Sequence, residues 1–90
     1  MEVERQLVAS ENGYRILLLG AKFAQECDLQ QGKPVTVAYK GKTYETKMHS
    51  EQKGRVDGLT SMYEDFPDRF QEGDSIQAIY DPSTNTIVLS

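Results

Sequence analysis

The 90-residue chain contains one cysteine, one histidine and no tryptophan. A single cysteine excludes an internal disulfide framework, so we expect a reducing, cytoplasmic setting. With one cysteine and one histidine, a zinc site would consist mostly of carboxylates, and we predict no metal site. The sequence also lacks a glycine-rich phosphate loop and a nucleophile motif. We therefore expect a protein that is not an enzyme and binds no cofactor.

Long apolar runs are missing as well. The longest, Ile16–Leu19, has the length of a strand and not the roughly 18 residues of a membrane span. The first residues, MEVERQ, are rich in charge and lack the apolar core of a secretory signal. The expectation is a chain without a leader and without membrane association.

Charge is present in both signs but is unevenly distributed. The net charge is −4, yet residues 33–55 carry six basic and two acidic groups, whereas residues 56–90 carry one basic and seven acidic groups. Such asymmetry is typical of a surface that meets a charged partner. It also occurs on ordinary solvated faces, and both interpretations stay open at this point.

One segment occurs twice. Leu29–Lys40 reads LQQGKPVTVAYK, and Phe70–Asp81, 41 positions later, reads FQEGDSIQAIYD. Each copy has an apolar anchor, a glycine three positions on, and a mostly apolar strand that reaches a tyrosine. The glycine is typical of a turn or helix end in the left-handed region, and a core strand follows. Two copies in a short chain predict a pseudo-twofold barrel, because a solenoid needs three or more repeats.

The whole pattern predicts a mostly β fold, a seven-stranded pseudo-symmetric open barrel with two short helices, in a single domain over residues 1–90. Asn12-Gly13 between two apolar runs indicates a β-hairpin that joins strands over Val3–Ala9 and Tyr14–Leu19. Apolar stripes at helical spacing predict helices over residues 21–28 and 60–66. The other strands are expected in Pro34–His49 (a hairpin turning at Lys40-Gly41), Arg55–Asp57, Phe70–Asp81 and Thr86–Leu89.

The hairpin register is specified by its hydrophobic pattern. Val37 is expected opposite Tyr44 and Tyr39 opposite Lys42, because a slip of one residue would turn Lys47 and His49 into the core. The residues expected to be mostly buried are apolar ones from all of these elements: Phe23, Leu29, Val35, Val37, Tyr44, Leu59, Met62, Phe66, Phe70, Ile76 and Ile79.

The element order, the repeat and two short phrases resemble the DNA-binding pseudobarrel family. The phrases are Leu18-Leu19-Gly20-Ala21-Lys22-Phe23-Ala24 and Glu72-Gly73-Asp74-Ser75-Ile76. The family includes plant B-three domains and restriction-endonuclease DNA-recognition domains, and the chain is more distantly similar to AbrB-type swapped-hairpin barrels. This chain departs from the family in having glycine at position 20 where proline is common, no tryptophan, and an acidic net charge.

The resemblance implies that two arms hold the major groove of double-stranded DNA. The implied DNA-binding residues are Ser10, Asn12, Tyr14 and Arg15 in the first arm, and Lys47, His49, Gln52, Lys53 and Arg55 in the second. Arginine can donate two bonds to guanine, asparagine or glutamine can pair with adenine, and lysine holds phosphate. Each residue also has a structural interpretation, such as Asn12 in the turn or Arg15 paired with an acid.

The alternative is an acidic protein-interaction or accessory module that binds no nucleic acid. Its acidic C-terminal half would then face a basic partner protein, or the oppositely charged segments of two copies would meet across a dimer. The position of the cations separates the two hypotheses. Convergence of Arg15, Lys47, Lys53 and Arg55 on one concave face would favour nucleic acid, and scatter would favour the interaction module.

Overall fold

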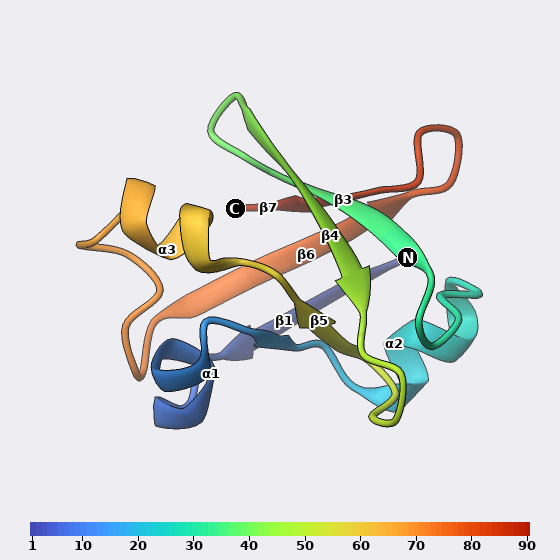
Figure 1. Ribbon diagram of the computed structural model, residues 1–90, viewed down its shortest axis with the longest axis horizontal. Coiled ribbons are helices and arrows are strands. Elements are labelled where there is room, and N and C mark those ends of the chain that lie inside the picture. Colours follow the sequence, from blue (N-terminus) through green and yellow to red (C-terminus); the bar gives the residue numbers. More distant parts are fainter.

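Seven strands form one sheet that curls into an open half-barrel, as the computed structural model of residues 1–90 shows (Figure 1). The sheet order is β1-β6-β7-β3-β4-β5-β2, and only β3 and β7 pair in parallel. The mostly β class expected from the sequence is confirmed. The strands are β1 (Glu2–Gln6), β2 (Leu17–Leu18), β3 (Pro34–Tyr39), β4 (Lys42–Met48), β5 (Arg55–Asp57), β6 (Ser75–Asp81) and β7 (Thr86–Leu89).

Three helices accompany the sheet: α1 (Ala9–Tyr14), α2 (Ala21–Glu26) and α3 (Thr60–Asp65). The helices predicted over 21–28 and 60–66 are present in slightly shorter form. α2 buries Phe23 and Ala24 and α3 buries Met62 and Tyr63, so each covers part of the barrel core. None of the three is long and apolar enough to cross a membrane.

The hairpin predicted around Asn12-Gly13 is wrong. α1 occupies this segment, and β1 pairs with β6 rather than with β2. The reason is the side chain of Glu11, which is completely buried. Its carboxylate accepts hydrogen bonds from the backbone N–H groups of Val8 (2.8 Å) and Leu18 (2.7 Å) and from the guanidinium of Arg5. A hairpin would direct these donors to another strand, whereas the helix brings them to one acceptor.

The β3–β4 hairpin has the predicted register. Val37 lies opposite Tyr44 and Tyr39 opposite Lys42, and the turn between the strands lies at the top of Figure 1. The apolar face of this hairpin points into the half-barrel, where Val37 is fully buried and Tyr39 is 4% exposed.

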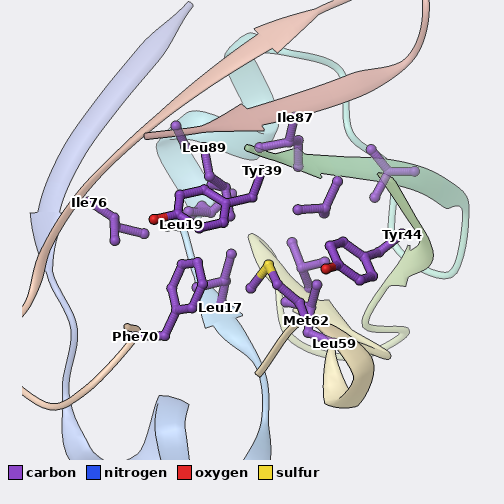
Figure 2. Packing of buried hydrophobic residues seen from close by; sticks show 14 of the residues in the cluster. Leu17, Leu19, Tyr39, Tyr44, Leu59, Met62, Phe70, Ile76, Ile87 and Leu89 are labelled. Atoms are coloured by element: carbon purple, nitrogen blue, oxygen red, sulfur yellow. The ribbon is translucent and has the colours of Figure 1, made fainter. Parts of the chain in front are cut away.

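Most predicted core residues pack together in the half-barrel (Figure 2). Two differ. Ile79 is 42% exposed, because inward-facing Ile76 and Ala78 on β6 turn it to the outer face. Phe66 is partly buried at the margin, where its ring meets that of Tyr39 edge-on at 4.8 Å.

The two copies of the repeat make equivalent hydrogen bonds. Gly32 donates its N–H to the carbonyl of Met48 (3.0 Å), and Gly73 donates to that of Leu7 (2.8 Å). Both glycines have positive φ, 78° and 89°, as the repeat predicts. Each copy follows a helix and leads into a strand, β3 in the first copy and β6 in the second. The two copies therefore have similar backbone conformations and similar hydrogen bonds.

Candidate nucleic-acid interface

The two predicted arms lie at opposite ends of one short strand pair. β2 and β5 are antiparallel, with Leu17 opposite Val56 and Leu18 opposite Arg55. The first arm (residues 10–15, within and just after α1) leads into β2, and the second arm (residues 47–55, around the β4–β5 loop) leads into β5. Both lie along the lower edge of Figure 1, with the β2–β5 pair between them.

In the first arm, the polar side chains divide into bound and free groups. Asn12 is half-buried, and its Nδ2 donates a hydrogen bond to the carbonyl of Phe70 (2.9 Å). This bond anchors α1 to the repeat loop, so Asn12 has a structural role, although not the turn role expected. Ser10 is exposed, and Tyr14 is 74% exposed. These two side chains are available to a partner.

Arg15 ends α1 in the left-handed region, at φ 57°. Its guanidinium carbon lies 5.7 Å from the centre of the Tyr63 ring, in a cation–π arrangement. The Tyr63 hydroxyl donates to the carbonyl of Ile16 (2.8 Å), which fixes the ring. Burial, followed by the negative charge of Glu11, raises the pKa of Tyr63, so the hydroxyl stays protonated and remains a donor.

A hollow of about 320 Å³ opens beside Arg15, between the end of α1 and α3. Gln71 borders it and donates its Nε2 to the carbonyl of Pro67 (2.8 Å). Neither Tyr63 nor Glu64 was predicted to belong to the site, because both fall in the helical stripe of residues 60–66 or beside it. The lining residues are Asn12, Arg15, Tyr63, Glu64, Pro67 and Gln71.

His49 shapes the second arm from within. Its Nδ1 accepts the backbone N–H groups of Glu51 and Gln52, both at 3.0 Å. The backbone N–H of His49 donates to the carbonyl of Arg55 (2.8 Å), which closes the loop. The half-buried ring therefore has a structural function, and any contact with nucleic acid would come from its neighbours.

The second arm is fixed by contacts with the residues that lead into α2. Leu19 donates its N–H to the carbonyl of Gly54 (2.8 Å). Gly54 has φ 79°, and its Cα packs so closely on Gly20 that a side chain would overlap the Gly20 backbone. Lys53, next to it, is exposed and lines a hollow of about 360 Å³ whose other lining residues come from α2 and the loop after it, among them Gln25 and Gln30.

The cations of the second arm differ in how free they are. Arg55 is half-buried, and its Nε forms an ion pair with Asp57 at 2.7 Å. Lys47 is exposed on β4 directly opposite Asp57, with no ion pair of its own. Lys53 and Gln52 are exposed and form no side-chain hydrogen bond within the chain. Lys47, Gln52 and Lys53 are therefore the available groups of this arm.

The four cations do not converge: three lie along the β2–β5 pair and its ends, and Lys47 lies on the neighbouring strand β4. Arg15 and Lys53 line two different hollows, and Arg55 lies between them on the β2–β5 pair. The cations therefore do not share one concave face, which is the arrangement that the sequence predicts for an interaction module.

A further polar cluster lies away from the arms and ties α3 to β4. Tyr44 donates its hydroxyl to Asp65 (2.8 Å), and the Lys42 ammonium lies 3.3 Å from the same oxygen. The Tyr44 hydrogen bond, with help from Lys42, lowers the pKa of Asp65. Burial, followed by this hydrogen bond, raises the pKa of Tyr44 to about 12. Every polar group of the cluster has a partner, which indicates a structural role.

Comparisons with known proteins support the fold alone. No family of known proteins matches the sequence, and no curated protein matches it. Among solved structures, that of a hypothetical protein from Arabidopsis thaliana is similar, with a TM-score of 0.71 at 12% identity. The similarity covers 100% of this chain and 87% of the other. At this identity the two chains share an architecture, and nothing about activity follows.

Proposed function

We propose that this protein binds double-stranded DNA through its two arms. The observation that carries the proposal is the position of the arms at the two ends of the β2–β5 pair, with free polar and basic groups on each. The sequence resemblance to DNA-reading barrels is a second support.

The free groups have complementary roles in such a complex. Lys47 and Lys53 contact phosphates, and the Gln52 amide is free to pair with adenine. The acidic remainder of the chain repels DNA, but at physiological salt this repulsion is screened beyond about 8 Å. Binding is therefore expected to be weak for random sequence and steeply salt-dependent.

The proposal also covers the cellular location of the protein and its lack of enzymatic activity. Cys27 is a half-buried free thiol, which suits a reducing cytoplasm, and burial raises its pKa, which disfavours the reactive thiolate. We propose a cytoplasmic, non-enzymatic DNA-binding domain.

The test is a fluorescence-polarisation titration of a short mixed-sequence duplex at low salt. Lys53→Ala should weaken binding and reduce the slope of log affinity against log salt by roughly 1, since one phosphate contact is lost. Lys40→Ala is the matched control. Lys40 is also exposed but lies in the β3–β4 turn, at the other end of β4, and its loss should change affinity less than about twofold. Equal effects of the two variants would contradict the arm assignment.

A protein-interaction module is the second candidate, favoured by one apolar pair on the outer face of the sheet. Ile79 and Val88 lie opposite each other on β6 and β7, and they are 42% and 44% exposed. If no duplex binds even at low ionic strength, the DNA proposal fails and this function takes its place.

A further inference from the structure

Only one of the four arginines has its guanidinium free. No carboxylate lies within ion-pairing distance of Arg15, and its side chain donates no hydrogen bond within the chain. The other three form ion pairs with acids: Arg5 with Glu11, Arg55 with Asp57 and Arg69 with Asp74. A guanidinium has five N–H donors, so Arg15 keeps its full capacity for a ligand.

The free arginine is also held in place. Its backbone is fixed where α1 ends, and Glu11 ties α1 to β1 and β2. Its guanidinium lies over the Tyr63 ring, which is 3% exposed and immobilised through its hydroxyl. Packing against a fixed aromatic face limits the orientations of the guanidinium, and less entropy is lost when it binds.

The surroundings of Arg15 favour a neutral ligand over an anion. Glu64 lines the same hollow, and its carboxylate forms no hydrogen bond or ion pair within the chain. Asn12 and Gln71 each donate one amide N–H to a backbone carbonyl, and their side-chain oxygens accept no hydrogen bond within the chain. A phosphate would meet these acceptors and the charge of Glu64. A ligand with acceptors for Arg15 and a donor for Glu64 fits better.

We propose that Arg15 and Glu64 together read a G·C base pair in the major groove. Guanine presents N7 and O6 as a pair of acceptors that matches the fork of Arg15, and cytosine presents its N4 amino group as a donor to a carboxylate. The inference rests on the DNA-binding function proposed above and deepens it. It assigns base reading to the hollow between α1 and α3, and it gives Arg55 a structural role.

The experiment selects duplexes with a randomised centre on the wild-type protein and on four variants at low salt, and sequences the bound fraction. Wild type should enrich G·C at one or more positions. Arg15→Ala removes every donor to guanine and should remove that enrichment, whereas Glu64→Gln keeps only a neutral acceptor for cytosine and should reduce it. Arg69→Ala and Glu72→Gln make the same chemical changes outside the hollow and should retain it. Circular dichroism establishes that each variant is folded.

A second readout separates base contact from phosphate contact. Replacing the enriched guanine by 7-deazaguanine removes one of its two acceptors, so it should weaken wild-type binding about 5- to 10-fold and leave the binding of Arg15→Ala unchanged. A loss of about 1 in salt slope for Arg15→Ala, with G·C enrichment unchanged in the same variant, would mean a phosphate contact and overturn the inference. Wild-type binding without enrichment would also overturn it while the DNA-binding function stands. If wild type binds no duplex, both fail.

Discussion

At the scale of single residues, the buried carboxylate of Glu11 determines how the first arm is built. It is one of two buried polar or charged residues in the chain, and it accepts hydrogen bonds from two backbone N–H groups and from Arg5. A buried carboxylate is tolerated only when its oxygens are satisfied in this way. Glu11 therefore links β1, α1 and β2 through one side chain.

Replacing Glu11 by Ala should lower the free energy of unfolding by about 3–5 kcal/mol. The change leaves the Arg5 charge and the N–H groups of Val8 and Leu18 without their acceptor. Chemical denaturation measures the effect. Glu4→Ala is the control, because Glu4 is exposed on β1, and it should change stability by less than about 0.5 kcal/mol. A loss below about 1 kcal/mol in Glu11→Ala would refute the anchoring role.

At the scale of elements, every helix is too short to be stable alone. Each has six residues, whereas an isolated helix needs roughly 12–15. α1 depends on Glu11 and Asn12, α3 on its buried face and on the bond from Tyr44 to Asp65. The β4–β5 loop likewise depends on His49 and on the contact of Gly54 with Gly20. The arms are thus positioned by tertiary contacts.

The second arm supplies a prediction at this scale. Gly54→Ala should destabilise the protein by about 2–4 kcal/mol, because the new Cβ overlaps the Gly20 backbone and the residue has positive φ. Gly32→Ala has nearly the same φ, 78° against 79°, and open space around the new Cβ. It should cost only the backbone strain, about 1 kcal/mol. Thermal unfolding of the two variants measures the difference, and equal losses would show that the packing on Gly20 is unimportant.

At the scale of the whole molecule, the inner face of the half-barrel is buried and its outer face is exposed to solvent. The hydrophobic core cluster lies on the inner face, whereas Ile79 on β6 and Val88 on β7 lie on the outer face. Successive side chains along a strand point to opposite faces of the sheet. Whether an apolar residue is buried therefore depends more on its position in the strand than on its type.

Two isoleucines of β6 test this division. Ile76 is 2% exposed, so Ile76→Ala should cost about 2–5 kcal/mol through lost burial and a residual cavity. Ile79 is 42% exposed, so Ile79→Ala should cost less than about 1 kcal/mol. Both are measured by chemical denaturation. Similar midpoints for the two variants would contradict the inward and outward assignment.

Elements that depend on short-range sequence patterns could be predicted before the structure was known. Alternation in Pro34–His49 set the β3–β4 register, because a slip would bury Lys47. The repeated glycines Gly32 and Gly73 predicted two equivalent turns. Apolar residues at helical spacing predicted the positions of α2 and α3. The same alternation, applied to β6, would have placed Ile79 outside, since Ile76 and Ala78 share the other face.

The conformation of the first arm, and which cations form ion pairs, depend on tertiary contacts. Asn12-Gly13 is a hairpin signal in isolation, but one buried carboxylate with partners at Arg5 and Leu18 outweighs it. The sequence also cannot distinguish Arg55, which Asp57 neutralises, from Arg15, which has no acid partner. Both outcomes depend on which distant groups meet in space, and the energy of burying a charge or satisfying it is set by those neighbours rather than by local pattern.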